Sequence, residues 1–194
     1  MGFVIACALP LIPPIHHRIL AAMQRKSSFP PVTDPRTRLL ILGSLPGEES
    51  LRQAQYYAHP QNRFWELVGA AVGTDLRVLT YPDRLAALLR NRIGLWDVIA
   101  DARRMGSLDS AIRDARGNDL RQMAGSLPSL EAIAFNGKKS ATAGRKQLGE
   151  DGERYRLIDL PSSSPAYAAM SYADKYSHWA VIGSIAGVPK RADN

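Results

Sequence analysis

The stretch Arg38–Gly47, RLLILGSLPG, joins an uninterrupted apolar run to a turn that contains Gly43, Pro46 and Gly47. A short apolar run that ends at turn residues is typical of a strand buried on both faces, as in a parallel sheet. Glycine and proline then favour a tight turn directly after the strand. The stretch therefore predicts the first strand of a buried sheet and a loop whose backbone can approach a ligand.

Strand patterns and helical patterns alternate along the rest of the chain. Further strands are expected at residues 93–100, 130–136 and 155–160, and helices at 62–72, 81–92, 107–115, 118–127, from 137 onwards and at 164–186. The last helix is expected to have Ser164 as its N-cap and Pro165 as its first residue. This alternation predicts an α/β fold, a three-layer α/β/α sandwich around a short, mainly parallel sheet. Residues 1–37 are interpreted as an N-terminal extension and lead-in loop, and residues 38–194 as a single domain.

Composition limits the class of protein. The chain has 194 residues, a formal net charge of +7 and one cysteine, Cys7, so an intrachain disulfide and an all-cysteine metal site are excluded. The apolar opening is broken by prolines, no run reaches membrane-spanning length, and Met23 is a possible start. A cytoplasmic, monomeric protein without metal or cofactor is expected. The basic charge points weakly to nucleic acid, and a merely soluble basic protein fits it equally well.

Four loops are expected to meet at one edge of the sheet, because ligands bind at the carboxyl ends of parallel strands. These loops are 43–47, 97–101, 136–139 and 161–165. The run PSSSP offers hydroxyl and backbone donors before a helix and suits a phosphate, although an N-cap turn explains any one such serine. Lys138 and Lys139 begin a helix, where they oppose its dipole, so phosphate contact and a solvated charge pair remain open.

Four segments, taken in order, resemble the uracil-DNA glycosylase superfamily. They are GSLPG at 43–47, YYAHPQNRFW at 56–65, FNGKK at 135–139 and LPSSSPA at 160–166. The ordered set, and HPQNRFW above all, is most similar to the branch that contains hypoxanthine (deoxyinosine)-DNA glycosylases. The resemblance covers about residues 38–185. It implies an enzyme that flips a damaged nucleotide out of the DNA stack and hydrolyses its N-glycosidic bond.

The resemblance also implies a set of site residues. Tyr57 matches the aromatic residue that stacks on the flipped base, and its alternative is a core tyrosine. Tyr167 lies where relatives insert a wedge into the base stack, or is an ordinary helix residue. The other base-binding candidates are Leu45, Phe64 and Asn136. The DNA-binding candidates are Pro46, Gly47, Arg104, Lys138, Ser162, Ser163, Ser164 and Tyr167.

The chain departs from the family at two catalytic positions. Many members have Asp or Asn where this chain has Leu45, and His or Asn where it has Leu160. Asn62 matches an asparagine that the similar branch uses for catalysis, so it is expected to orient water, with capping of the next helix as the alternative. The other catalytic candidates are Ser44 and His59, and the weaker candidates for a carboxylate are Glu48, Asp97 and Asp101. Arg63 either contacts phosphate or faces solvent.

The sequence thus predicts a monofunctional glycosylase that removes a deaminated base and leaves an abasic site. Uracil is the favoured base because it is the common substrate of the superfamily, and hypoxanthine is the alternative. A non-catalytic binder of damaged or abasic DNA is a second alternative, which the loss of both usual catalytic side chains supports. The predicted partner is DNA with a deaminated base, and no membrane is involved. The protein is expected to associate with the nucleoid during repair.

Overall fold

The computed structural model describes residues 25–187. The expectations for Cys7 and a start at Met23 fall outside these residues. None of the helices between residues 25 and 187 is both long and apolar enough to cross a membrane.

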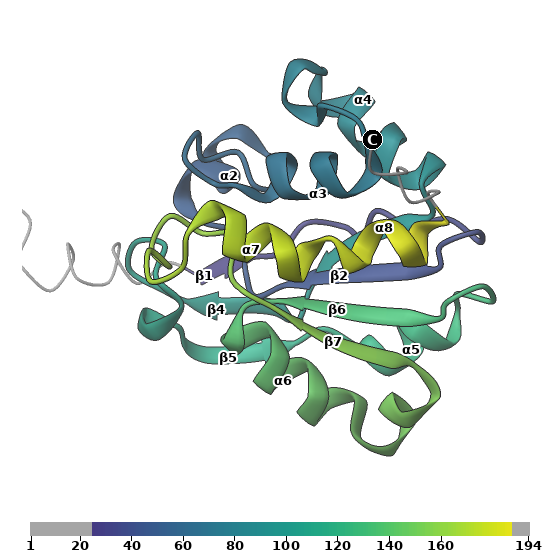
Figure 1. Ribbon diagram of the computed structural model, residues 1–194. Helices are drawn as coiled ribbons and strands as arrows, with labels where there is room; N and C mark the ends of the chain where they lie inside the picture. The colour runs from purple at the N-terminus through teal and green to yellow at the C-terminus, as the bar shows by residue number, and fades with distance from the viewer. Residues whose placement is uncertain (1–24, 188–194) are drawn as a thin grey trace, which may run out of the picture.

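A parallel sheet of four strands forms the centre of the molecule (Figure 1). The strands are β2 (Leu39–Gly43), β3 (Ile93–Asp97), β6 (Ala132–Asn136) and β7 (Arg156–Leu160), in the order β3-β2-β6-β7. Every residue of β2 and β6 is buried, as expected for strands covered on both faces. The apolar run of the opening stretch is thus a central strand, as predicted.

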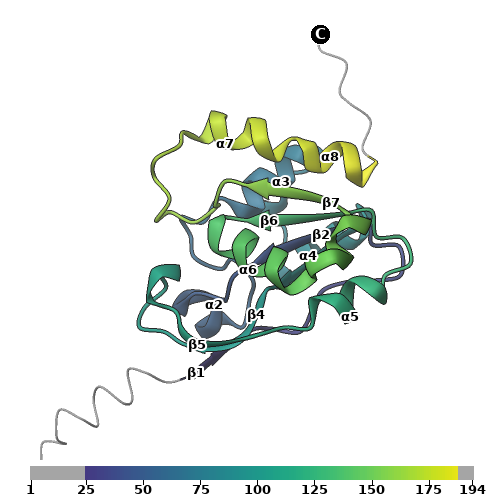
Figure 2. The same ribbon diagram turned by 90° about the horizontal axis from the view of Figure 1, so that it is seen from below.

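Helices cover both faces of this sheet (Figures 1 and 2). One face carries α3 (Phe64–Val72), α4 (Tyr81–Arg90), α7 (Tyr172–Trp179) and α8 (Val181–Ala186), and the other carries α5 (Leu120–Gly125) and α6 (Lys138–Leu148). Successive strand residues point to opposite faces, so Leu39 and Ile41 join the first core while Leu40 and Leu42 join the second. The predicted three-layer sandwich is confirmed. The remaining short helices are α2 (Glu48–Gln53), η1 (Leu76–Val78), η2 (Asp109–Ala111) and η3 (Gly149–Arg154).

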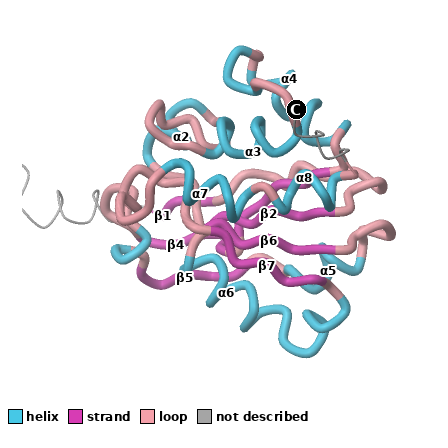
Figure 3. Tube along the Cα trace, viewed as in Figure 1, coloured by secondary structure: helices cyan, strands magenta, loops and turns pink. Residues whose placement is uncertain are grey.

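A second, antiparallel sheet was not predicted (Figure 3). It contains β1 (Arg25–Ser27), β4 (Ile99–Arg103) and β5 (Arg113–Gly117), in the order β1-β4-β5. The lead-in segment is therefore partly a strand, and the helix expected at 107–115 is wrong. Asp101 accounts for much of this sheet, because it is buried on β4 and forms ion pairs with Arg25 of β1 and Arg116 of β5. These long-range contacts override the local helical pattern.

The long C-terminal helix expected from Ser164 is also wrong. Residues 161–171 form a loop, and α7 begins only after Ser171, whose hydroxyl accepts a hydrogen bond from the Asp174 amide at 3.1 Å. The hydroxyl of Ser164 instead accepts a hydrogen bond from the amide of Ala166 at 3.2 Å. Ser164 therefore closes a local turn, and Ser171 caps the helix.

Candidate active site

One cavity of about 430 Å³ lies at the carboxyl edge of the parallel sheet. The loop after β2, the end of β3, the end of β6 and the loop after β7 all contribute to its wall, as the fold rule predicts. Residues from the segment 56–62 and the loop 107–110 also line it. The cavity has the size and position expected of a pocket for a small molecule or a single base.

Asp97 is the most unusual group in this cavity. It ends β3 beside Gly43, is 3% exposed, and its Oδ2 atom has no hydrogen-bond partner among the described residues. Burial, and secondarily the charge of Asp109, raises the pKa of Asp97 to about 8, against the lowering effect of Arg104. The side chain is therefore mostly a neutral acid at pH 7 and is able to donate a proton.

Gly43 makes room for this arrangement. A Cβ atom at this position would overlap Oδ1 of Asp97 and lie 2.9 Å from the hydroxyl oxygen of Tyr57. Only glycine, which has no Cβ, lets the Asp97 carboxyl and the Tyr57 hydroxyl sit this close to the end of β2. The predicted approach of the Gly43 backbone to a ligand stays a prediction, and the structure shows two side chains of the cavity close to Gly43.

Tyr57 is held in the cavity wall through both its ring and its hydroxyl. The ring stacks on Phe64 with centroids 3.8 Å apart, and the hydroxyl accepts a hydrogen bond from Asn136 Nδ2 at 3.1 Å. A φ of +53° is uncommon for a tyrosine, so these contacts hold a strained backbone in place. The ring is therefore fixed in the wall of the cavity.

Phe64 is fully buried behind Tyr57 and is not among the residues that line the cavity. It is the first residue of α3, and its ring also packs edge-on against Trp179 of α7, with centroids 5.9 Å apart. The prediction that Phe64 binds the base is therefore wrong, because this ring supports Tyr57 from the core side.

Asn136 uses its amide to join three parts of the site. Its Nδ2 donates to the hydroxyls of Tyr57 and Ser163, and its Oδ1 accepts from the Ser163 amide at 2.9 Å. Ser163 is buried although it lines the cavity, and its amide and hydroxyl are both bound to Asn136, so its predicted contact with the DNA backbone stays a prediction. Both residues tie the loop after β7 to the end of β6.

Asn62 lines the cavity just before α3. Its Oδ1 accepts a hydrogen bond from the amide of Phe64, the first residue of α3, at 3.0 Å. The N-cap residue of α3 is Arg63, and no side chain forms a cap hydrogen bond there, so the capping alternative holds only in the looser sense that Asn62 binds the first amide of the helix. A carbonyl oxygen has two lone pairs, so Oδ1 can accept a second hydrogen bond from water.

The other two catalytic candidates differ in their surroundings. Ser44 lines the cavity, and its hydroxyl donates to Asp109 Oδ1 at 2.6 Å. His59 also lines the cavity but is exposed, and its Nδ1 accepts a hydrogen bond from the Gln61 amide at 3.2 Å. Asp109 was missed from the sequence, because it lies in the segment expected to be a helix.

Leu45 stands where the resemblance led us to expect a polar group, and its side chain packs into the core beside the cavity. It is 6% exposed and belongs to the core that includes Leu42 and Val98. The apolar side chain thus stabilises the loop after β2, which forms this part of the wall.

The predicted DNA contacts at the mouth of the cavity fall into two groups. Pro46, Gly47, Ser162, Ser164 and Tyr167 line the cavity, whereas Lys138 is exposed at the start of α6 outside it. Lys175 of α7 fixes Tyr167, because its Nζ donates to the Tyr167 carbonyl at 2.7 Å and lies 5.1 Å from the ring centroid.

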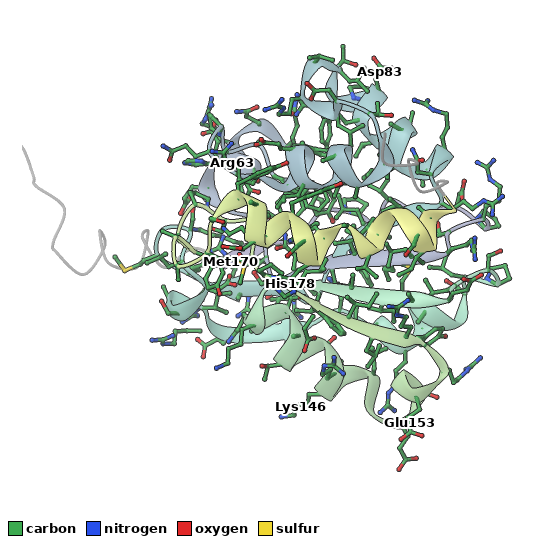
Figure 4. The ribbon with its side chains drawn as sticks, viewed as in Figure 1. Arg63, Asp83, Lys146, Glu153, Met170 and His178 are labelled. Atoms are coloured by element: carbon green, nitrogen blue, oxygen red, sulfur yellow. The ribbon has the colours of Figure 1, made fainter. Side chains whose placement is uncertain are left out.

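The start of α7 is also tied to the start of α3. Figure 4 labels Arg63 and Met170 at the same end of the molecule, and the Arg63 guanidinium lies 5.9 Å from the Tyr172 ring centroid. Arg63 also forms an ion pair with Glu66 at 2.6 Å. Arg63 thus holds Tyr172, the residue that directly follows the loop 161–171, against the start of α3.

Arg104 is buried, so the prediction that it binds DNA is wrong. It is 1% exposed, and its guanidinium donates to the carbonyls of Leu45, Pro46 and Gly106. A planar guanidinium with five donors can satisfy several carbonyls at once. Arg104 therefore clamps the β4–β5 hairpin to the loop after β2.

Replacing Arg104 by methionine should lower the free energy of unfolding by about 2–4 kcal/mol, because three carbonyls lose their donor. Urea unfolding followed by circular dichroism measures this change. The matched control is Arg103→Met at the exposed neighbouring position, which should change stability by less than about 0.5 kcal/mol. Equal stability of the two variants would show that the clamp contributes nothing.

The weaker carboxylate candidates are now separated. Glu48 pairs with Lys26, and Asp101 pairs with Arg25 and Arg116, so neither of these two carboxylates is in the cavity. Asp97 is the member of this group that lines it. Among residues 25–187, no group of three or more His, Cys, Asp or Glu side chains is placed to hold a metal ion.

Comparison with known proteins identifies the class to which this fold and cavity belong. The model of the uracil DNA glycosylase superfamily matches residues 30–182. The chain belongs to this superfamily and is a DNA glycosylase, a hydrolase whose substrate is DNA.

Particular relatives place the chain more closely. It is 44% identical over 157 residues to a hypoxanthine DNA glycosylase of Methanosarcina acetivorans, and the match covers 81% of this chain and 97% of the relative. It is 49% identical over 116 residues to a hypoxanthine DNA glycosylase of Methanosarcina barkeri, covering 60% and 73%. A solution NMR structure of a protein provisionally assigned as a uracil DNA glycosylase, from Methanosarcina acetivorans, has a TM-score of 0.73 at 42% identity and covers 84% of this chain and 99% of that chain.

Proposed function

We propose that this enzyme excises hypoxanthine, the deaminated form of adenine, from DNA. The 44% identity to a hypoxanthine DNA glycosylase along nearly its whole length carries the proposal. Hypoxanthine is thus preferred over uracil as the proposed substrate. Uracil was the first expectation only because it is the common substrate of the superfamily. The cavity of about 430 Å³ is large enough to accept a purine.

The neutral Asp97 carboxyl suits the edge of hypoxanthine. Its O–H group can donate to the base oxygen O6, while its carbonyl oxygen accepts from N1–H. An ionised carboxylate could only accept, so the raised pKa of Asp97 is what makes the paired contact possible. Uracil carries a similar edge, and therefore the choice of a purine rests on the relatives and not on this contact.

Asp97 also offers a way for the base to leave. As the bond between C1′ and N9 breaks, its electron pair moves to the base and the sugar becomes an oxocarbenium ion. Transfer of the Asp97 proton to the base releases neutral hypoxanthine and leaves a carboxylate in the site. A neutral acid here replaces the side chain that is missing at Leu160.

Water then completes the reaction at C1′. Asn62 Oδ1 holds the water through its second lone pair, and the hydrogen bond from the Phe64 amide fixes the position of this oxygen. The water oxygen bonds to C1′, and the proton it loses returns to the Asp97 carboxylate directly or through solvent. An oxocarbenium ion is reactive enough to be attacked by neutral water, so orientation is the main task of Asn62.

Tyr57 and Asn136 hold the base without reacting. Tyr57 presents one ring face to the base while Phe64 packs on the other, and Asn136 fixes the Tyr57 hydroxyl. Tyr167, at the mouth of the cavity, enters the base stack in this proposal. The residues proposed to contact the DNA backbone are Pro46, Gly47, Ser162, Ser164 and Lys138.

The enzyme acts as a monomer in this proposal and uses no metal or cofactor. It leaves the strand uncut, because no lysine lines the cavity in the part of the chain that the structure describes, and a strand-cutting step would need an amine to form a Schiff base.

Oligonucleotides with one hypoxanthine or one uracil test the proposal, with alkali used to cut at abasic sites. We expect excision of hypoxanthine at a rate at least about tenfold above that of uracil, a difference of roughly 1.4 kcal/mol in barrier height. Faster excision of uracil would overturn the assignment. Tight binding to abasic DNA with no excision of either base would instead support a non-catalytic binder.

A further inference from the structure

Two large apolar side chains are exposed at the tip of the β4–β5 hairpin. Met105 is 62% exposed and Leu108 is 56% exposed, and Leu108 lines the mouth of the cavity. Val78 on η1 is more exposed, at 78%, but it is not part of the cavity wall. A single exposed apolar side chain is ordinary on a protein surface. Two of them beside the cavity indicate a surface that contacts a binding partner.

The tip is held in place by three contacts. Arg104 Nε and Lys26 Nζ donate to the Gly106 carbonyl at 3.1 and 3.0 Å, and the Glu48 amide donates to the Ser107 hydroxyl at 2.9 Å. The apolar side chains are therefore presented on a fixed support. Ordered presentation reduces the entropy lost when they bury against a partner.

The surroundings of the tip carry exposed positive charge. Arg103 and Arg113 are exposed near its two ends, and Arg113 donates to the carbonyls of Ser110 and Ile112. Arg103 meets a carboxylate only at 3.8 Å, and Arg113 forms no ion pair within residues 25–187. Apolar side chains flanked by exposed arginines match a polyanion with an apolar interior, which is the make-up of stacked DNA.

We propose that Met105 and Leu108 form an apolar wedge that enters the base stack of duplex DNA beside the flipped nucleotide. The inference rests on the proposed function. It gives the enzyme a second DNA-inserting element, on the β4–β5 hairpin, besides Tyr167 on the loop after β7. Removal of a base from the stack leaves neighbouring bases without a partner surface, and apolar side chains at the cavity mouth fill that space. Leu108 and Tyr167 both line the cavity, so both inserting elements lie beside the extruded nucleotide in this proposal.

The test compares two substrates that differ only in whether the base must be extruded from paired DNA. One duplex has hypoxanthine opposite cytosine, and the other has hypoxanthine in a three-nucleotide unpaired bubble. The double variant Met105→Ala, Leu108→Ala should excise from the paired duplex at least about tenfold more slowly, because two apolar side chains no longer bury in the stack. Its rate on the bubble should stay within about twofold of the unaltered enzyme, since little unstacking is needed there.

Val78→Ala is the matched control, because it also shortens an exposed apolar side chain, and it should leave both rates unchanged. Fluorescence of 2-aminopurine placed next to the hypoxanthine reports unstacking without turnover, so it tests the wedge even if no base were excised. The double variant should lose most of the fluorescence rise that the unaltered protein produces. An equal loss of rate on both substrates, or unchanged fluorescence and rate on the paired duplex, would overturn the wedge.

Discussion

Replacing Asp97 by asparagine should slow hypoxanthine excision at pH 7 by about a hundredfold, the size typical of a lost general acid. Asparagine keeps the shape of the side chain and can still pair with the base, but it has no proton to transfer. The rate of the unaltered enzyme should fall as pH rises through about 8, the pKa to which burial raises Asp97. The variant should show no such fall in its residual rate.

The raised pKa of the Asp97 carboxyl also predicts how the free energy of unfolding changes with pH. Its pKa rises from 3.8 in the unfolded chain to about 8 in the folded protein, so the folded state binds more protons between these values. Its contribution to stability is therefore full below pH 3.8 and is lost as pH rises through about 8. Asp97→Asn should remove this decline, and urea unfolding across that range measures it.

Glu153→Gln provides the control for both measurements, because Glu153 is exposed on η3 and does not line the cavity. Figure 4 shows Glu153 at the other end of the molecule from Arg63 and Met170. It removes one carboxylate and should alter neither the rate nor the dependence on pH. If Asp97→Asn retained full activity and the same pH profile as the unaltered enzyme, Asp97 would not be the acid.

Replacing Asn62 by alanine should also lower the excision rate by about a hundredfold, as expected when a reacting water is misplaced. The same change leaves the Phe64 amide without its hydrogen bond to Asn62 and should cost about 1 kcal/mol of stability. Single-turnover kinetics on the hypoxanthine duplex measure the first effect, and urea unfolding measures the second.

Asn62→Ser separates the two effects, because a serine hydroxyl can accept the hydrogen bond from the Phe64 amide but serine lacks the side-chain amide group. If Asn62 orients water, the serine variant should regain stability and remain nearly as slow as the alanine variant. Recovery of the rate together with stability would assign Asn62 to the bond with the Phe64 amide alone.

The central layer of the fold could be predicted because its signals are local. The apolar run at 39–42 and the helical spacing in α3 follow from periodicity, and both elements are present. The antiparallel sheet could not be predicted, because it depends on Asp101 meeting Arg25 and Arg116 through contacts that no local pattern reveals. Its strands are short, and the pairing between β4 and β5 has register shifts.

The cavity was predicted in outline and corrected in detail. The turns at Gly43 and the serine run were placed correctly, since the ends of parallel strands share one edge. Residue type alone did not separate exposed from buried groups, so Arg104 and Ser163 were expected on DNA although both are buried. Asp97 stood among the weaker candidates, because its burial and its free Oδ2 become visible only when β3 lies beside β2.

The most direct test of the proposed reaction is to identify its products. The enzyme is incubated with a duplex that contains one hypoxanthine, and the products are separated and identified by mass spectrometry before any alkali is added. We expect free hypoxanthine and a full-length strand that has exchanged the base for a hydroxyl group at C1′. A strand that keeps its base, or one already cut at that position, would contradict the proposed hydrolysis.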